Sequence, residues 1–562
     1  MTPASFKTSN GSLIRVIGDP ELLTMDRIQI LRDHFDSDPR IASISIQATD
    51  VSELNETFLR ATAPAGCLIA LTDNDLTRKP ETGINEDLDS LVAWSQAASQ
   101  KGLWHDWWYL SSRDVRTASV ILEPNELDLL EAQDPTGSQF HAKDISPINV
   151  NAISITVDVT WLGEHETGAQ VLTTAAIGAL ANDSRITSIR LAGRTELPEY
   201  ARHLTALGKV HMESTETEGE EGREPHQSDI VWYPNQIDQR VDIGQARRLG
   251  KRVITTYLDL IAYDIGMYHS SPESWAAYRA MQRKIALSVD GITTISKDVA
   301  KRLYQETPRL EHKRIHAIPL GLDHIAQDSP MEIPQGLSAT RPFLLVFGND
   351  FNHKNRDFAI EVWEELLNRG ESIDLILAGL HVKASSSKDR EKDLIAKHVN
   401  LRGSIHTLGH VSSSERAWLL KNAQAIIYPS SAEGFGFVPY EAALLGTPTS
   451  FTSFGPLKEI SQVSGLPRNW STSSYAADLH ELIHSETART KRVTQLQDVS
   501  ATLTWQDFAN QLVEFFARVS QMPTVSSSVI SSASSADAAA LSKVLNSKSW
   551  KVTAPLRKIM KK

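Results

Sequence analysis

Short apolar runs alternate with longer amphipathic segments over most of the chain. Runs such as 153–159, 343–347 and 374–378 are each followed by a polar loop and then by a segment with helical periodicity. Continuous apolar runs of this length are typical of strands that are buried on both faces, as in parallel sheets. The alternation therefore predicts α/β domains built on parallel sheets.

The most informative stretch of this pattern extends from residue 423 to residue 448. Apolar residues around Ile426 and Ile427 predict a buried strand. Pro439 begins an apolar segment that ends at Gly446, and this combination predicts a helix. A loop rich in glycine joins the predicted strand to the predicted helix.

This loop carries the chemistry of a ligand site. Gly434 and Gly436 allow backbone N–H groups to approach a ligand, and the following helix directs its positive end toward the same place, which suits an anion. Glu433 and Glu441 are eight positions apart and can both face this space, where a carboxylate can accept hydrogen bonds from vicinal hydroxyls. Taken singly, Glu441 could only complement the helix dipole and Glu433 could be a solvated loop charge. The combination with both glycines is more specific.

Composition narrows the class of protein. The chain has 562 residues with 41% hydrophobic residues, enough for more than one ordinary globular core. A net charge of -12 argues against general binding to nucleic acid. Cys67 is the single cysteine, so the chain forms no intrachain disulfide and no cysteine-rich metal site. No signal peptide or membrane-spanning apolar run is found, which predicts a cytoplasmic protein.

Composition shifts divide the chain into four predicted parts. The expected boundaries are an N-terminal α/β domain of unknown role at 1–148, two larger α/β units at 149–335 and 336–520, and a tail at 521–562. In the first part, Asp73-Asn74-Asp75 follows an apolar strand and could hold a metal-bound nucleotide sugar as in GT-A glycosyltransferases, although turn formation is the favoured interpretation. The aromatic run 104–109 could stack on sugar rings, although a core or interface role is favoured.

The Glu433-Gly434-x-Gly436 loop with Glu441 resembles the Glu-x7-Glu signature of retaining glycosyltransferases of family 4, which have the GT-B fold. Further segments match the family in order over residues 153–519: a glycine-bearing loop at 163–168, a strand end at Ser296, a Pro-Leu-Gly-x-Asp exit at 319–323, and a His-Lys-Asn loop around Lys354. The resemblance implies an α/β protein with two Rossmann-like, doubly wound domains of the GT-B type. The small N-terminal α/β domain predicted from its apolar runs is extra to this fold.

The resemblance also implies roles for individual residues. Glu433 and Lys354 are the implied catalytic residues, with Glu433 on the donor sugar and Lys354 on the diphosphate. Asp259 is implied on the acceptor side. Further residues are implied to bind the donor, either by contacting its diphosphate, ribose or base or by forming the facing wall of the cleft. They are Gly434, Phe435, Gly436, Glu441, Asn349, Val411, Thr167 and Gly168. No metal or other cofactor is implied, because a helix terminus and a lysine hold the charge.

Two positions depart from the family pattern. Leu258 replaces a common histidine, and Asn349 replaces a common arginine. A retaining enzyme can act without a side-chain base at the first position, since the leaving phosphate itself can accept the proton.

We therefore expect transfer of a sugar from a nucleotide diphosphate sugar to a hydroxyl of a cell-envelope glycan or glycolipid. The alternative is a non-catalytic GT-B scaffold that binds partners in a glycan assembly complex.

The tail differs from the rest of the chain. Residues 524–536 are rich in serine and suggest a flexible tether. Residues 541–562 contain seven basic residues, no acidic one, and interleaved apolar residues such as Leu545 and Trp550. This segment could bind an anionic membrane at the inner face, or it could be a disordered basic tail. Membrane binding would suit a lipid-linked acceptor.

Overall fold

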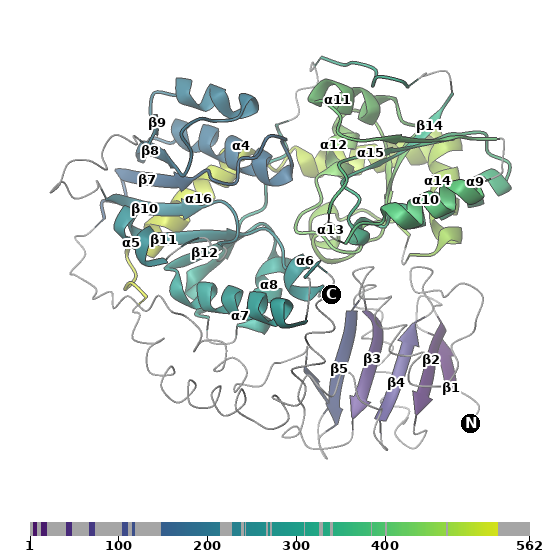
Figure 1. Cartoon of the computed structure of the whole chain (residues 1–562), viewed down its shortest axis with the longest axis horizontal. Helices are drawn as coiled ribbons and strands as arrows, with labels where there is room; N and C mark the ends of the chain where they lie inside the picture. Colours follow the sequence, from purple (N-terminus) through teal and green to yellow (C-terminus); the bar gives the residue numbers. More distant parts are fainter. Residues whose placement is uncertain are drawn as a thin grey trace, which may run out of the picture.

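The structure is a computed structural model of the whole chain (Figure 1). It describes six strands within residues 4–118, and then residues 148–525 apart from gaps at 214–226, 238–240, 242, 266–267, 270–271, 308–309, 325–329, 338–340, 384, 399–401 and 468–469. The Asp73–Asp75 turn and the basic tail at 541–562 lie outside the described residues. No helix among those described combines the length and the apolar character that crossing a membrane requires.

The N-terminal segment contains one mixed sheet. Its strands follow the order β1-β2-β4-β3-β5-β6, in which β3 and β5 are parallel and the other neighbours are antiparallel. The strands expected from the first three apolar runs are present, and the aromatic run 104–109 lies within β5. The bounds are β1 (Ala4–Lys7), β2 (Leu13–Gly18), β3 (Ile41–Gln47), β4 (Cys67–Thr72), β5 (Trp104–Leu110) and β6 (Val115–Ala118).

The second unit is a Rossmann-like domain with a seven-stranded sheet in the order β13-β12-β11-β10-β7-β8-β9. All neighbouring strands are parallel. The strands are β7 (Ile153–Asp158), β8 (Ile186–Ala192), β9 (Val210–Met212), β10 (Ser228–Tyr233), β11 (Gly250–Tyr257), β12 (Gly291–Thr294) and β13 (Ile315–Ala317). The helices are α4 (Gly168–Asn182), η4 (Glu199–Ala206), α5 (Ile243–Leu249), α6 (Ile261–Asp264), α7 (Pro272–Ser288), α8 (Lys297–Glu306) and η7 (His312–Arg314).

The third unit repeats this plan with a five-stranded parallel sheet in the order β16-β15-β14-β17-β18. Its strands are β14 (Phe343–Phe347), β15 (Asp374–Ala378), β16 (Ile405–Leu408), β17 (Ala425–Tyr428) and β18 (Thr449–Phe451). The helices around it are η8 (Asn352–Lys354), α9 (Arg356–Asn368), α10 (Lys388–Lys397), α11 (Ser413–Asn422), α12 (Val438–Leu444), α13 (Gly455–Ser461), α14 (Thr472–His484) and α15 (Glu486–Ser500).

The strand orders determine where a ligand can bind. In each sheet the winding reverses at one point, between β7 and β10 in the first domain and between β14 and β17 in the second. Loops that follow these strands diverge and leave a crevice at the carboxyl ends of the strands. The loops after β14 and β17 contain Lys354 and Glu433, so the fold brings together two residues that are far apart in the sequence.

The last described helix, α16 (Trp505–Ser520), returns from the second Rossmann-like domain to the first, as Figure 1 shows. Its start is fixed because the Trp505 N–H donates to Asp323 Oδ1 at 2.8 Å. Gly321 leaves room for this helix, since a Cβ there would lie 2.4 Å from the Trp505 nitrogen. The expected closing helix that crosses back is therefore present.

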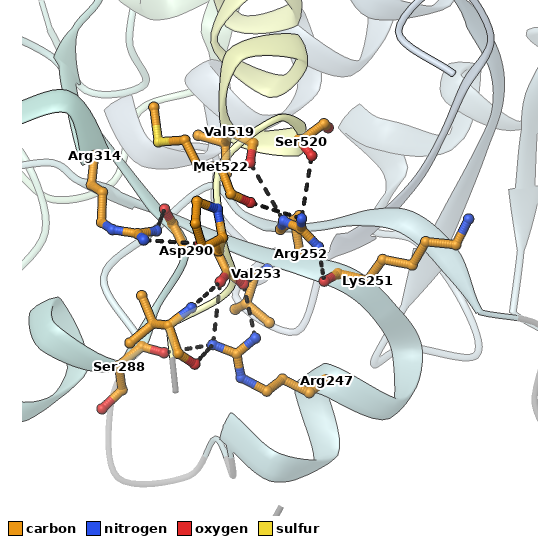
Figure 2. Close-up of polar contacts among 12 residues, drawn as sticks. Arg247, Lys251, Arg252, Val253, Ser288, Asp290, Arg314, Val519, Ser520 and Met522 are labelled. Carbon is orange, nitrogen blue, oxygen red and sulfur yellow. Dashed lines mark hydrogen bonds and ion pairs between the residues drawn. The ribbon is translucent and has the colours of Figure 1, made fainter. Parts of the chain in front are cut away.

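The end of α16 is anchored by buried arginines of the first domain (Figure 2). Arg252 donates to the carbonyl oxygens of Val519, Ser520 and Met522 at 3.4, 3.2 and 2.9 Å. Arg314 lies beside this contact and donates to the Asp290 carbonyl at 3.0 Å. The Arg252 guanidinium therefore binds carbonyl groups at the end of the helix, where the regular intrahelical hydrogen bonds stop. The helix thus joins both domains into one folded body.

Candidate functional site

Lys354 and Glu433 meet at the carboxyl ends of β14 and β17. Lys354 Nζ lies 2.5 Å from Glu433 Oε1, and the Tyr428 hydroxyl donates to the same oxygen at 2.5 Å. Lys354 Nζ also lies 5.6 Å from the centre of the Tyr428 ring. The side chain of Glu433 is 8% exposed and that of Lys354 is 21% exposed. The pair is thus partly withdrawn from water, where charge interactions are strong.

The backbone of the first loop explains the position of Lys354. Gly348 follows β14 with a φ of +143°, a conformation that other residues rarely adopt. The short helix η8 ends at Lys354. Asn355, the next residue, is left-handed with a φ of +50°, and its side-chain amide donates to the Pro429 carbonyl at 3.0 Å. That hydrogen bond joins the loop after β14 to the loop after β17.

The glycines of the second loop are required by close packing. A Cβ on Gly434 would lie 1.8 Å from the carbonyl oxygen of Leu258, which follows β11 of the other domain. Gly436 has a φ of +88°, and Phe435 between them is buried at 3% exposure. The helix after this loop begins at Val438, one residue before Pro439, and Gly446 follows it with a positive φ, as its sequence predicts.

Asp259 faces this pair from the first domain. Its Oδ1 accepts a hydrogen bond from the Ile261 N–H at 2.9 Å. Burial raises the pKa of Asp259 to about 6; repulsion from Glu433 adds to the rise, whereas the Ile261 hydrogen bond and Lys354 oppose it. The predicted acceptor-side residue and the two predicted catalytic residues therefore lie in one electrostatic neighbourhood.

Glu441 is enclosed by two partners. The side chain is 1% exposed, and it accepts hydrogen bonds from His324 Nε2 at 3.2 Å and from Arg416. Burial alone would raise the pKa of this carboxyl, but the Arg416 charge and the His324 hydrogen bond outweigh it and lower the pKa to about 2. His324 follows the first domain and Arg416 lies on α11, so Glu441 joins the two halves of the molecule.

The loop before α4 reaches the second domain at two points. Gly168 lies against Phe437, since a Cβ there would be 3.3 Å from the Phe437 ring. The rings of His165 and His410 have centres 4.2 Å apart. Val411 follows His410 and packs at the edge of the core. Thr167 is exposed at the start of α4, where its N–H donates to Gln170 Oε1 at 3.1 Å.

Asn349 connects two loops of the second domain. Its Oδ1 accepts a hydrogen bond from the Leu380 N–H at 3.1 Å, so the amide holds the chain after β15 close to the chain after β14. Asp350, the next residue, binds the same segment through the Val382 N–H and His381 Nδ1, each at 2.7 Å.

A hollow lies between the two domains beside Glu433. Its walls carry both apolar and charged groups, so it could receive a ligand with a polar and an apolar side. The lining residues are Leu260, Ile261, Asp264, Ile265, Asp298, Val299, Arg302, Ala432 and Glu433.

Several residues of this site were not predicted. Tyr428, Arg416 and His324 contact the two predicted glutamates, yet none belongs to a motif with a fixed spacing. Of these three residues, only Tyr428 could have been suspected from its local sequence position. It is the last residue of β17 and therefore lies at the carboxyl edge of the sheet, where ligands bind. The positions of Arg416 and His324 depend on the packing of α11 and on the path between the domains.

Two Rossmann-like domains, a helix that returns from the second to the first, and a site between the carboxyl ends of the two sheets define the GT-B architecture. The predicted α/β, GT-B fold class is confirmed. Residues 331–493, most of the second domain, match the family model described as Glycosyl transferases group 1.

Two curated relatives are named as glycosyltransferases. D-inositol 3-phosphate glycosyltransferase of Nocardiopsis dassonvillei is 24% identical over 341 residues, which cover 58% of this chain and 77% of the relative. MMP alpha-(1->4)-mannosyltransferase of Mycolicibacterium hassiacum is 24% identical over 187 residues, 33% of this chain and 42% of the relative. These similarities support a transferase that uses a nucleotide sugar, and they do not single out family 4.

The solved structures that this chain matches are more distant in sequence. The N-terminal domain of Candida albicans trehalose-6-phosphate phosphatase has a TM-score of 0.49 at 12% identity, covering 68% of this chain and 99% of that one. Anabaena HepE, solved with UDP and glucose, has a TM-score of 0.46 at 16% identity, with 64% and 98% covered.

Proposed function

We propose that this chain is a retaining glycosyltransferase of family 4, which transfers a sugar from a nucleotide diphosphate sugar to a hydroxyl of a cell-envelope glycan or glycolipid. The observation that carries the proposal is the convergence of Lys354, Glu433 and Asp259 at the carboxyl ends of both sheets. This is where doubly wound sheets bind their ligands. The similarity of the second domain to group 1 glycosyl transferases supports the choice of chemistry.

In this proposal, Lys354 binds the diphosphate and stabilises the negative charge that develops as the sugar leaves. The backbone of Gly434, Phe435 and Gly436 borders the same group. Glu433 accepts hydrogen bonds from the donor sugar once the diphosphate has taken over its present partner, Lys354. Both residues come from loops at the switch point of one sheet, so the donor would lie across that point.

The nucleoside is assigned to the region around Glu441. A carboxylate offers more acceptor sites than the two hydrogen bonds from His324 and Arg416 use. Because the side chain is 1% exposed, ribose hydroxyls would reach it only after one of these two partners moves away. Val411 is assigned to the base side, Asn349 to the diphosphate side at the position of the family's arginine, and the Thr167–Gly168 loop to the facing wall. The hollow beside Glu433 is assigned to the acceptor, and Asp259 directly precedes its lining residue Leu260.

The proton of the acceptor hydroxyl needs a base. Asp259 carries a raised pKa and is ionised above about pH 6, but its Oδ1 already accepts from the Ile261 N–H. We therefore propose that the departing phosphate accepts the proton, which is possible when the acceptor attacks the same face of the sugar that the phosphate leaves. Asp259 is then assigned to orienting the acceptor. No divalent metal is proposed for this step, because Lys354 supplies the positive charge.

The direct test measures donor hydrolysis and sugar transfer with each common nucleotide sugar, with and without EDTA. Lys354→Ala should lower kcat/KM by about 10² to 10³, as removal of one stabilising group at a developing charge commonly does. Lys388→Ala, on the same domain, is the matched control. Proton NMR of the anomeric hydrogen should show the same configuration in donor and product. An inverted product, or loss of turnover in EDTA, would reject the corresponding part of the proposal.

A non-catalytic scaffold is the second candidate. The two departures from the family favour it. Leu258 cannot act as a base because it has no titratable group, and Asn349 carries no positive charge and already accepts a hydrogen bond from the Leu380 N–H. A scaffold would show no turnover with any donor, and Lys354→Ala would not change nucleotide binding. Turnover with even one donor decides for the enzyme.

We also propose that the basic tail binds anionic membrane surfaces, which would bring the chain to a lipid-linked acceptor. Its seven basic residues and interleaved apolar residues support this role. Co-sedimentation with vesicles containing phosphatidylserine should fall when residues beyond Ser535 are removed, and should fall for the full chain as salt increases. Equal binding of both forms would contradict a role for the tail.

A further inference from the structure

A cluster of three potential metal ligands lies on the second Rossmann-like domain, away from the donor cleft. His480 Nδ1 and His484 Nε2 each lie 2.7 Å from Glu371 Oε1, and the two imidazole centres are 4.6 Å apart. All three ligand atoms lie within 4.8 Å of one another. Glu371 precedes β15, so the cluster is at the amino edge of the sheet, whereas Lys354 and Glu433 follow the carboxyl ends of strands.

The helix α14 places both histidines on one face. Residues four apart on a helix lie one turn above each other, so the imidazoles project in the same direction. The opposite face of α14 is buried through Tyr475, Leu479 and Leu482, which fixes the helix against the core. The histidines are therefore presented by a rigid element.

Glu371 is presented by a rigid turn. The chain leaves α9 at Gly370, which has a φ of +106°, and the Gly370 and Glu371 N–H groups donate to Leu367 and Leu366 carbonyls at 3.0 and 3.1 Å. This pattern of hydrogen bonds after a helix, with a left-handed glycine, holds the next residue in a defined position. Glu371 has a side chain that is 13% exposed, whereas each histidine is 53% exposed.

We propose that Glu371, His480 and His484 form a binding site for a divalent transition-metal ion, with Zn²⁺ as the best fit. Two imidazole nitrogens and one carboxylate oxygen, with a fourth position for water, are a ligand set that Zn²⁺ commonly accepts. Harder cations such as Mg²⁺ prefer oxygen ligands and are not expected here.

The geometry requires only a small adjustment. Ligand atoms around a tetrahedral Zn²⁺ are roughly 3.3 Å apart, given metal–ligand distances of about 2.0–2.1 Å. The nitrogen to oxygen distances of 2.7 Å must therefore widen by about half an ångström. Half-exposed imidazoles can make this change by side-chain rotation, without movement of α14 or of the turn.

The charge of the cluster also suits a cation. Glu371 supplies one negative charge beside two imidazoles, and an ionised carboxylate is the form that binds metal. His480 and Glu371 already connect α14 to the turn before β15, although more than 100 residues separate them in the sequence. A bound ion would strengthen this connection and would therefore stabilise the domain.

The test uses the full chain stripped with EDTA and then dialysed. Titration with ZnCl₂ alone, followed by calorimetry, should show one saturable site with a Kd on the order of micromolar or tighter. Thermal unfolding should shift upward with added ZnCl₂. Binding of Co²⁺ should produce visible absorption typical of four-coordinate nitrogen and oxygen ligation.

Single variants assign the site. His480→Ala, His484→Ala and Glu371→Gln should each weaken Zn²⁺ binding at least about tenfold, since even the loss of an outer hydrogen-bond partner of a metal ligand costs that much. The matched controls are Glu481→Gln, an exposed carboxylate on the same helix, and His211→Ala, an exposed imidazole on β9. Circular dichroism checks that each variant is folded.

Two results would overturn the proposal. Absence of saturable Zn²⁺ binding by the wild-type chain would show that the cluster is a hydrogen-bonded clamp between α14 and the turn. Wild-type affinity in all three variants would show that the ion binds elsewhere. A tight site that is lost in the three variants and retained in both controls establishes it.

Discussion

The ammonium nitrogen of Lys354 lies 2.5 Å from Glu433 Oε1, although 79 residues separate the two in the chain. The pair is mostly buried, and its only other described close partner is the Tyr428 hydroxyl on the same oxygen. A diphosphate that binds Lys354 must compete with this carboxylate. The proposed donor site therefore includes an ion pair that donor binding would rearrange.

Breaking this pair should reduce the stability of the fold. Lys354→Met leaves a buried carboxylate with the Tyr428 hydroxyl alone, and such a loss commonly costs about 3–5 kcal/mol. Lys354→Met combined with Glu433→Gln should be less destabilised than Lys354→Met, since no unpaired charge remains. Urea unfolding of the wild type, both single variants and the double variant measures the coupling. Strict additivity of the two single effects would show that the pair contributes no interaction energy.

The Glu441 carboxylate should make the protein sensitive to acid. Its folded-state pKa of about 2 lies below the ordinary value of 4.5, so its contribution to stability is present above pH 4.5 and is lost as the pH falls toward 2. The upper limit of that contribution is about 3 kcal/mol. In the wild type the urea concentration at the unfolding midpoint should decrease as the pH falls through this range, and in Glu441→Gln this decrease should be smaller.

Arg416→Ala provides a second test of the same cluster. It removes the main charge that stabilises the Glu441 carboxylate and should therefore raise the pKa of Glu441 and destabilise the protein at neutral pH. Lys421→Ala, an exposed cation at the end of the same helix, is the control and should change stability little. Equal effects of Arg416→Ala and Lys421→Ala would contradict the importance of the buried contact.

Asp259 should show the opposite dependence on pH. Its folded-state pKa of about 6 lies above the ordinary value of 3.8, so the folded state binds the proton more tightly than the unfolded state. Stability should therefore decrease as the pH rises from about 4 to about 6, and Asp259→Asn should remove that decrease. Asp393→Asn, an exposed carboxylate on α10, should leave the profile unchanged. Denaturant midpoints measured in half-unit pH steps test this.

Gly434→Ala should separate the two domains. The new Cβ would lie 1.8 Å from the Leu258 carbonyl oxygen, a backbone atom that cannot move without the strand end. We expect a larger radius of gyration by small-angle scattering and a higher KM for the donor. Gly409→Ala is the matched control, because nothing lies within 4 Å of its Cβ position. An unchanged radius of gyration in Gly434→Ala would mean that the loop, rather than the domain contact, absorbs the clash.

A second contact between the domains involves the start of α8. The Glu459 carboxylate accepts hydrogen bonds from the Lys297 and Asp298 N–H groups at 2.9 Å each. It thereby caps a helix of the other domain and opposes the positive end of its dipole. Glu459→Ala should cost about 1 kcal/mol and speed hydrogen exchange at the first turn of α8. Lys458→Ala, exposed on the same helix as Glu459, should leave that exchange unchanged.

Much of the fold could be predicted because its signals are local. Apolar runs at 343–347 and 374–378 became β14 and β15, and the strand predicted around Ile426 became β17. Gly446 ends α12 with a positive φ, as a glycine after a helix commonly does. Glu433 and Lys354 could also be nominated, since glycine-bearing loops that follow buried strands are where such sheets bind ligands.

The sequence by itself therefore determined the α/β class, the positions of several strands and helices, and the loops that carry the candidate chemistry. These depend on periodicity and turn residues within about ten neighbours. Only the tertiary structure decided that Glu441 contacts His324, 117 residues away, that Gly434 packs against Leu258, and that Glu371 meets the two histidines of α14. These contacts follow from strand order and from the docking of one domain on the other, which are properties of the whole chain that no local pattern specifies.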